Sequence, residues 1–465
     1  MKNAVLTRFD RFDQVAISLL VSLLLAVVGI AWLGHTSPPP ISAYLPAPNT
    51  SMGVTGQIGI KFLRKMDIAQ VPTLQVQNLQ SGEVVPGTVA WQQDTLWFKP
   101  TAPLTPNTTY QAQIQPGQLQ AIDGRTFHQA LTWQVQVRNP ELVYLAPVDG
   151  ARELWRLDPF TDEVAQQLTQ SDGNIFDFGI SRDGERIAYS VINANGGTDL
   201  WQMARDGSHA NILVNCQLDR CTEPAFSPDG SRIAYSREVA PQDPTTQPQS
   251  PPRLWTVELS TGRTAQLYQD SQVLGYNASF SPDGNYLAFF DAAQQGIRIL
   301  DLSNRKVQIL PSWTGQVGAW SPDGKQMLYS EVIFADDQQS VTLLSADLAS
   351  QATTPIDISH IGEISSLPAW SPDGEWLVAG LRPLDGGVAL QLWQFRPDGS
   401  SAKPLTEDAL FTWGMYRWDP TSQWLVAQRL ELQKSYATPE LILWNRTTGE
   451  MRPLVSNATF PAWLP

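Results

Sequence analysis

The sequence has few of the residues from which metal sites and catalytic centres are built. It contains 4 histidines among 465 residues, and only His209 and His360 lie in its repeat-rich C-terminal part. Two histidines are too few for a three-histidine metal site and a poor basis for a Ser-His-Asp triad. Gly-x-Ser-x-Gly, His-Glu-x-x-His and Walker-type phosphate-binding sequences are also missing. We therefore expect no metal, no cofactor and no enzymatic activity.

Positive charge is scarce as well. The 31 lysines and arginines are outnumbered by 45 aspartates and glutamates, which gives a formal net charge of −14. Binding to nucleic acid or to an anionic membrane surface requires clusters of basic side chains. The charge balance therefore excludes nucleic acid as an expected partner.

Cysteine is nearly absent, with only Cys216 and Cys221 in the chain. A structural zinc site needs four ligands, and a catalytic dithiol usually has the Cys-x-x-Cys spacing, so neither is expected. A disulfide that closes a small loop and a pair of unpaired thiols both remain open.

One long stretch near the N-terminus lacks charge altogether. It runs from Val15 to Leu33, which is the length of apolar helix needed to cross about 30 Å of hydrocarbon. Three basic residues precede it, so the positive-inside rule places the N-terminus in the cytoplasm. A cleaved secretory signal is the alternative, although its apolar core is usually shorter.

This stretch leads to an expected topology for the whole chain. We expect a cytoplasmic stub at 1–12 and a transmembrane helix at 13–34 that contacts the lipid of the cytoplasmic membrane. A Pro-rich linker at 35–43 follows, and the bulk of the chain is then extracytoplasmic.

Residues 44–138 show short runs of alternating polar and apolar residues separated by turn signals, which predicts a small β-sandwich. The order of Leu96-Trp97-Phe98-Lys99-Pro100, then Thr109-Tyr110, then Ala121-Ile122-Asp123-Gly124 resembles that of bacterial Ig-like modules from cell-envelope proteins. This resemblance implies a spacer, with a ligand-binding sandwich as the alternative.

A five-residue motif recurs through residues 139–465. Trp370-Ser371-Pro372-Asp373-Gly374 has close copies that begin at Phe226, Phe280 and Trp320, and eroded copies that begin at Ile180 and Trp418. Pro presets φ and Gly accepts a left-handed conformation, so each copy predicts a tight turn after a strand. A period of roughly 40 to 54 residues fits one four-stranded propeller blade per repeat.

The motif and the Leu-Trp pairs that follow it resemble the WD-like repeats of TolB-type β-propellers. The ends of the array indicate the blade count. Residues 142–169 supply three strands without a motif, and residues 459–465 supply only the first strand of a repeat. Together they make one composite blade, so the predicted fold is all-β with a seven-bladed propeller, or six-bladed as the alternative. We expect the C-terminal strand to pair with the N-terminal strands of the array.

The two faces of a propeller differ in this sequence. Turns after the first and third strands of each repeat are short and regular, whereas those after the second and fourth strands vary, so the latter are the expected binding face. Aromatic and histidine side chains in the loops after the fourth strand could grip a peptide or stack on sugars, although packing between blades is the alternative. These candidate binding residues are Phe176, Phe178, Tyr276, Trp313, His360, Phe411, Trp413 and Tyr416.

These features predict a membrane-anchored, non-catalytic β-propeller of the cell envelope that binds or scaffolds another protein. The resemblance to TolB-type propellers implies an envelope protein or a polymer as the partner. The alternative is a carbohydrate-active enzyme or a polysaccharide-binding protein that uses the propeller channel.

Overall fold

A computed structural model describes residues 11–36, 38–48, 50–173, 175–241, 243, 248–335 and 338–465. The chain divides into two compact units. The first comprises Met1–Met52, Gly56–Ala102 and Asn107–Val137, and the second comprises Gly53–Thr55, Pro103–Pro106 and Arg138–Pro465. Most of the predicted stub at 1–12 lies outside the described residues.

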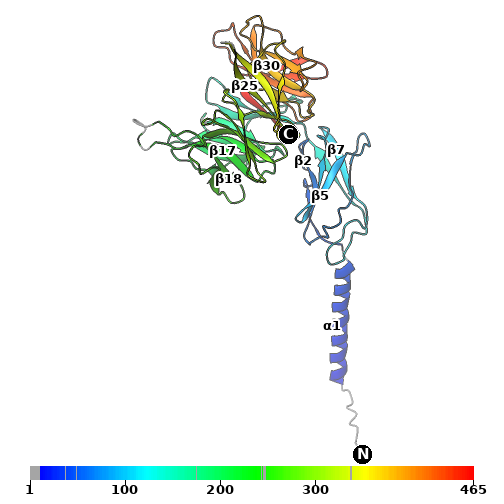
Figure 1. The fold of residues 1–465 in the computed structure, drawn as a ribbon. Coiled ribbons are helices and arrows are strands. Elements are labelled where there is room, and N and C mark those ends of the chain that lie inside the picture. The colour runs from blue at the N-terminus through cyan, green and yellow to red at the C-terminus, as the bar shows by residue number, and fades with distance from the viewer. Residues whose placement is uncertain are drawn as a thin grey trace, which may run out of the picture. The chain divides into compact units, whose positions relative to one another are not determined.

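The first unit begins with helix α1 (Arg11–Thr36), as Figure 1 shows. Apolar side chains on this helix such as Leu19 and Leu23 are exposed. Within the described part of the chain, no helix combines the length and the apolar character that crossing a membrane requires. The expected transmembrane helix, and with it the expected single-pass localisation, is therefore wrong.

The rest of the first unit is a sandwich of two four-stranded sheets, as the alternating pattern predicts. One sheet has the order β1 (Ile41–Leu45), β3 (Ile58–Phe62), β6 (Thr95–Pro100), β5 (Gly87–Gln92). The other has the order β2 (Ser51–Met52), β8 (Leu131–Val137), β7 (Thr108–Ile114), β4 (Leu74–Asn78). Inward-facing residues such as Ile60, Leu96 and Ala112 are fully buried, which confirms the predicted alternation.

The second unit is a series of antiparallel sheets, each built largely from one repeat. The first sheet combines both ends of the unit, with the order β37 (Thr459–Leu464), β9 (Glu141–Ala146), β10 (Glu153–Leu157), β11 (Gln166–Gln167). In it, Trp463 lies opposite Leu142 and Ala462 opposite Val143. The predicted pairing of the C-terminal strand with the N-terminal strands is thus confirmed.

The next two repeats form one eight-stranded sheet. Its first half contains β12 (Ile175–Ile180), β13 (Arg186–Ile192), β14 (Thr198–Ala204) and β15 (Asn211–Val214). Its second half contains β16 (Arg220–Phe226), β17 (Arg232–Glu238), β18 (Arg253–Glu258) and β19 (Thr264–Gln266). A single parallel pair, Thr198 with Arg220, joins the halves.

Four more sheets follow along the chain. The first contains β20 (Gly275–Phe280), β21 (Tyr286–Asp291), β22 (Gly296–Asp301) and β23 (Val307–Pro311), and the second contains β24 (Ala319–Trp320), β25 (Gln326–Ala335), β26 (Gln338–Asp347) and β27 (Thr353–Ile356). The third contains β28 (Glu363–Ile364), β29 (Ala369–Trp370), β30 (Leu377–Arg382), β31 (Gln391–Phe395) and β32 (Lys403–Pro404). The last contains β33 (Phe411–Trp418), β34 (Trp424–Glu431), β35 (Glu440–Asn445) and β36 (Met451–Ser456).

The core of the second unit lies between successive sheets rather than in one centre. Leu145 of β9 shares a cluster of buried apolar residues with Ile187 of β13, and the following sheets pack on one another in the same way. The last cluster joins Leu443 of β35 to Leu142 of β9. The final sheet therefore packs on the first, which holds the two ends of the unit together.

Candidate functional site

The recurring motif forms a hydrogen-bonded turn with the same contacts in each close copy. In the copy at residues 370–374, the Ser371 hydroxyl donates to Oδ1 of Asp373 (2.5 Å) and accepts the N–H of Trp376 (3.0 Å). Gly374 has a φ of 73°, which a residue with a Cβ rarely adopts. Outside the turn, Asp373 also pairs with the Arg446 guanidinium, and its N–H donates to the Ser422 hydroxyl (2.9 Å), so the motif has a structural role.

Four of the strands that carry the motif, β12, β16, β20 and β33, are bulged, and carboxylates near the first two bulges lie beside neighbouring backbone. Oδ2 of Asp177 accepts the N–H of Glu223 (2.7 Å), and Oε2 of Glu223 accepts the N–H of Asn277 (2.6 Å). Burial raises the pKa of Asp177 to about 6, and the Glu223 carboxylate acts in the same direction. These carboxylates join three consecutive motif strands, which is a structural use of acidic groups.

The candidate aromatic residues divide between core and surface. Trp413 and Tyr416 are 5% and 3% exposed and belong to the same buried cluster. Phe178 and Tyr276 are partly buried and pack against two other clusters. The structure therefore does not bring these four side chains together in one surface.

The remaining candidates lie at or near the surface. Phe176 is 49% exposed and Trp313 is 58% exposed, and His360 is exposed in a turn before β28. Phe411 is partly buried, with the Arg429 guanidinium 4.4 Å from its ring centre. Phe176, Trp313 and His360 are thus the candidates with the most exposed aromatic or imidazole surface.

A polar pocket lies among the variable loops that follow the second and fourth strands. It has a volume of about 270 Å³ and lies between the β24–β27 and β28–β32 sheets. We call it the loop-face pocket, and its walls include Ser330, Val341, Glu363, Ile364, Ser366 and Arg382. Hydroxyl groups and one charge of each sign give this pocket a capacity for polar recognition that the aromatic candidates alone do not have.

The two charged residues of the loop-face pocket are set by strand pairing. Glu363 of β28 lies directly opposite Arg382 of β30 in the antiparallel register. Both side chains are exposed, and within the described residues neither forms an ion pair with another side chain. A ligand can therefore meet a guanidinium and a carboxylate that form no ion pair with the described residues.

One of the predicted binding residues, Tyr416, contacts Ser366 in the wall of the loop-face pocket. The buried Tyr416 hydroxyl lies 2.9 Å from Oγ of Ser366, donates to the carbonyl of Leu367 (2.7 Å), and accepts the N–H of Gly380 (3.1 Å). Burial raises the pKa of Tyr416, so this hydroxyl stays protonated near neutral pH. Tyr416 is therefore a positioning residue for the pocket wall rather than a ligand contact.

Sequence reasoning missed the charged pair, since β28 is too short to show an alternating pattern. The signal that could have found it is the charge of Glu363 at the end of one variable loop and of Arg382 at the start of the next.

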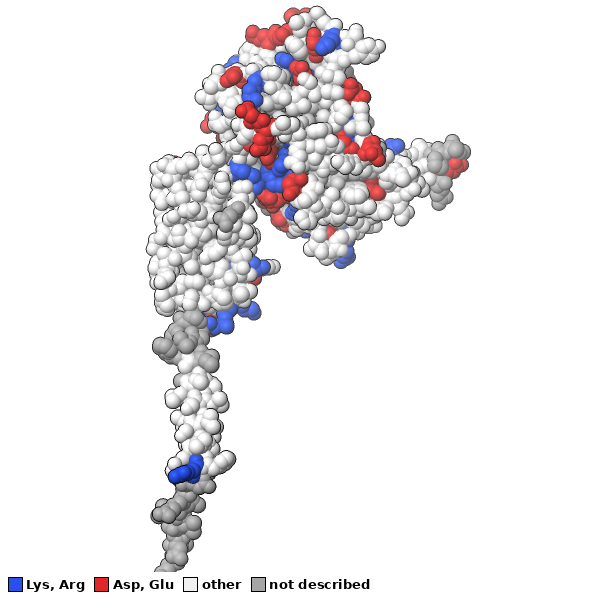
Figure 2. Space-filling model, turned by 180° about the vertical axis from the view of Figure 1, so that it is seen from behind, with Lys and Arg blue, Asp and Glu red and all other residues white. Residues whose placement is uncertain are grey.

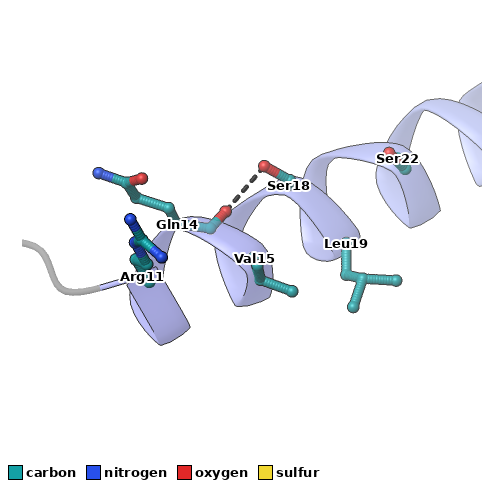
Figure 3. A pocket seen from close by; sticks show the side chains of 6 residues that line it. All are labelled: Arg11, Gln14, Val15, Ser18, Leu19 and Ser22. Atoms are coloured by element: carbon teal, nitrogen blue, oxygen red, sulfur yellow. Dashed lines mark hydrogen bonds between the residues drawn. The ribbon is translucent and has the colours of Figure 1, made fainter.

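A second hollow lies along α1 and is lined by Arg11, Gln14, Val15, Ser18, Leu19 and Ser22 (Figure 3). All six side chains come from one helix, and the Ser18 hydroxyl donates to the backbone carbonyl of Gln14 (2.7 Å). A hollow with walls from a single helix does not enclose a ligand, so it is not a candidate site.

The two cysteines form a disulfide, Cys216–Cys221. The loop that it closes carries Asp219, whose carboxylate accepts hydrogen bonds from the Arg237 guanidinium (2.8 Å) and the Ala240 N–H (2.8 Å). Both contacts are at the base of the Pro-rich loop between β17 and β18. The disulfide loop therefore anchors one of the variable loops.

The histidines do not assemble a catalytic group. Nδ1 of His209 lies 2.8 Å from the Ser208 hydroxyl in an exposed turn, while the Asp206 carboxylate accepts the Ser208 N–H instead of the imidazole. His360 lies near Asp357, outside the loop-face pocket. In the described ranges, no group of three or more His, Cys, Asp or Glu side chains has the arrangement of a metal site.

Charged side chains on the second unit gather in mixed groups rather than in a patch of one sign, as Figure 2 shows for one face. The largest such group joins Glu141 to Arg205 (2.5 Å) and to Arg156 (3.5 Å). Arg205 also donates to the carbonyl of Pro465 (3.2 Å). Burial raises the pKa of Glu141, although the arginines oppose this effect. This group therefore holds Pro465, the residue that follows β37, in place.

Comparison with known proteins places the first unit in a recognised family of domains. Residues 35–136 match a family described as a bacterial Ig-like domain. Two curated proteins are similar to parts of the chain. An uncharacterized protein of Agrobacterium fabrum (Atu1656) is 30% identical over 141 residues, which are 29% of this chain and 44% of that protein. The uncharacterized peptidase YuxL of Bacillus subtilis is 26% identical over 193 residues, which are 34% of this chain and 29% of that protein. The chain thus spans less than half the length of either relative.

Solved structures share the fold at low sequence identity. A puromycin-hydrolyzing peptidase of Mycobacterium tuberculosis has a TM-score of 0.51 at 13% identity, covering 91% of this chain and 57% of that one. A putative TolB from Agrobacterium tumefaciens has a TM-score of 0.39 at 20% identity, covering 53% of this chain and 84% of that one. The family match identifies a bacterial Ig-like domain at residues 35–136, and the match to the puromycin-hydrolyzing peptidase shows a shared fold.

The comparisons also correct one expectation. The expectation of no enzymatic activity rested on the lack of catalytic motifs in the sequence. It is overturned by the similarity to a protein named as a peptidase and by the shared fold with a puromycin-hydrolyzing peptidase.

Proposed function

We propose that this protein is a binding propeller that holds a segment of a partner protein in the loop-face pocket. The observation that carries the proposal is the free Glu363–Arg382 pair, exposed on the wall of a polar pocket about 270 Å³ in volume. Pockets of this kind, with a few convergent polar groups, are where ligand recognition is usually found. The variable loops around the pocket are held by regular sheets, which is the usual arrangement of binding loops.

A polymer of sugars is the other partner that the sequence allowed. Sugar sites rely on exposed aromatic rings that stack on the sugar. Trp413 and Tyr416 are buried and cannot serve in this way. Ser366, Glu363 and Arg382 instead offer a hydroxyl and two opposite charges, which complement a peptide with charged side chains or a chain end.

Site-specific photocrosslinking in cells tests this function. A photoreactive amino acid replaces Arg382 in the full chain, and in a matched control it replaces Arg263, an exposed arginine in the tight turn between β18 and β19. We expect a discrete protein adduct from position 382 that is absent from position 263. Equal adducts at both positions, or an adduct that glycosidases but not proteases remove, would overturn the proposal.

We also propose that the second unit is a closed ring of seven blades. The support is the composite sheet of β37 with β9, β10 and β11, together with the packing of Leu443 in the final sheet on Leu142 in the first. The loop-face pocket would then lie between two adjacent blades of this ring. Single-particle images of the protein, averaged along the ring axis, would count the blades directly.

A further inference from the structure

The hairpin beside the loop-face pocket is longer than the strands on either side of it. β25 and β26 each have 10 residues, whereas β24 has 2 and β27 has 4. β24 pairs with Met327 and Leu328 only, and β27 pairs with residues 343–346. Among the described residues, no third strand therefore pairs with Glu331–Ala335 or with Gln338–Thr342. We call these two segments the open ribbon.

One edge of the open ribbon presents main-chain groups beside the pocket. Leu328 pairs with Ala319, on the side of β25 that faces away from β26. The carbonyl of Ser330 points to the same side, since it accepts the Ser312 hydroxyl (2.9 Å). Main-chain groups alternate in direction along a strand, so the N–H and C=O of Val332 also face this free edge.

The free edge continues from the wall of the loop-face pocket. Ser330 lines the pocket, and Val332 follows it by two residues on the same face of the strand. Val332 lies directly opposite Val341, which also lines the pocket and is 38% exposed. A chain that paired with Val332 would therefore run toward Glu363 and Arg382, the pocket's two uncommitted charges.

We propose that an extended peptide segment of the partner protein adds to the edge of β25 as a further strand and carries an acidic group to Arg382. The inference rests on the proposed function and specifies its ligand. A strand edge offers N–H and C=O groups at the spacing of another peptide backbone, which an oligosaccharide cannot match along its length. Side chains of the added strand that face the pocket would supply the specificity, with Val341 as the apolar contact and Arg382 as the ionic one.

Random 12-residue peptides displayed on phage are a direct probe of this edge. They are selected on the full-length protein, and the best binder is synthesised for affinity measurement. Val332→Pro removes an N–H that faces the edge next to the pocket while leaving the β25–β26 pairing intact, because proline is tolerated at strand edges. Val332→Ala is the matched control, since it shortens the side chain and keeps that N–H. We expect Val332→Pro to weaken binding about tenfold or more and Val332→Ala to change it less than threefold.

A second measurement does not depend on the folding of a variant. The same peptide is N-methylated at one residue at a time, which blocks backbone donors without changing its side chains. Strand addition predicts loss of binding at every second position only. Equal tolerance of methylation along the peptide would overturn the inference, as would equal affinity for wild type and Val332→Pro.

Arg382→Ala separates this inference from the proposed function. A peptide that loses affinity with Arg382→Ala but not with Val332→Pro would leave the pocket as a binding site and reject strand addition. A peptide that is insensitive to both substitutions would reject both proposals, and selection of no peptide at all would reject the peptide ligand.

Discussion

The tight turns of the motif differ from the variable loops after the second and fourth strands in how closely their sequences and hydrogen bonds repeat. In the turn at 320–324, Oγ of Ser321 donates to Asp323 (2.7 Å) and accepts the N–H of Gln326 (2.9 Å), as its counterparts do in the other close copies. The variable loops differ from one another in length and sequence, and one of them extends as the open ribbon. Repetition in this sequence therefore marks residues that build the sheets, while departures from repetition mark residues that are free to bind.

An eroded copy of the motif sharpens this contrast. At residues 418–422, Asp419 occupies the place of the motif serine and is 1% exposed. Its Oδ1 accepts the N–H groups of Gln423 (2.8 Å) and Trp424 (2.7 Å), which closes the same turn. Ser422 takes the position of the motif glycine with a φ of 63°. The turn geometry is thus kept while the sequence changes, so erosion of the motif is no sign of function.

The largest expected effect on stability comes from removing β37, the strand that completes the first sheet of the second unit. Deletion of residues 459–465 removes β37, including Trp463 and Leu464, which are 8% and 0% exposed. Because β9 then loses one of its two partner strands and the final sheet loses part of its packing, we expect loss of cooperative unfolding in urea. Circular dichroism with a matched deletion of the described Pro-rich loop residues 248–250 provides the control. A truncated chain that unfolds like the parent would contradict this role for β37.

The buried Asp177 and the turn residue Asp323 should make the free energy of unfolding depend on pH in opposite directions. The pKa of Asp177 is raised to about 6 from an ordinary value of 3.8, so the folded protein binds more protons than the unfolded one between these values. Stability due to this group therefore falls as pH rises from about 4 to about 6, by up to about 3 kcal/mol. Asp177→Asn should remove this slope, which urea unfolding at a series of pH values would measure.

A turn aspartate is the matched control for this pH series. The hydrogen bond from the Ser321 hydroxyl lowers the pKa of Asp323. Its contribution is therefore present above about pH 4 and is lost as the pH falls through the lowered value. Asp323→Asn should therefore lower the free energy of unfolding above about pH 4 and have little effect at lower pH. Parallel stability curves for wild type and Asp177→Asn would show that Asp177 does not titrate as proposed.

The hydroxyl of the motif serine should be worth less than the buried carboxylate but more than any loop side chain. Ser371 is 0% exposed, and Ser371→Ala leaves the N–H of Trp376 without its acceptor. We expect a loss of about 2 kcal/mol in the free energy of unfolding. Ser303→Ala, in an exposed turn after β22, should cost less than about 0.5 kcal/mol. Equal losses of unfolding free energy from Ser371→Ala and Ser303→Ala would contradict a special structural role for the motif serine.

Much of the fold could be read from the sequence because its signals are local. Pro and Gly in the motif dictate turns, alternation predicts the sandwich strands, and the unmatched fragments at 142–169 and 459–465 predicted the composite sheet. The residues of the loop-face pocket were harder to predict from the sequence. Trp413 and Tyr416 look like loop residues in sequence, but they belong to β33, where a register shift between Gly414 and Arg417 interrupts the regular alternation. The pairing of Glu363 with Arg382 depends on a two-residue strand that no local pattern announces.

We expect the smallest change in stability from Trp313→Ala in a variable loop. This substitution tests whether variable-loop residues serve binding rather than stability. Trp313 is 58% exposed, so Trp313→Ala removes little buried surface and should change the free energy of unfolding by less than about 0.5 kcal/mol. Trp313 precedes Thr314, which lines the loop-face pocket, so the same substitution should weaken the binding of a selected peptide. Urea unfolding and peptide titration of one protein preparation measure both quantities. A large loss of stability with unchanged peptide affinity would place Trp313 with the structural residues, and the division between repeated and variable positions would then fail at its clearest example.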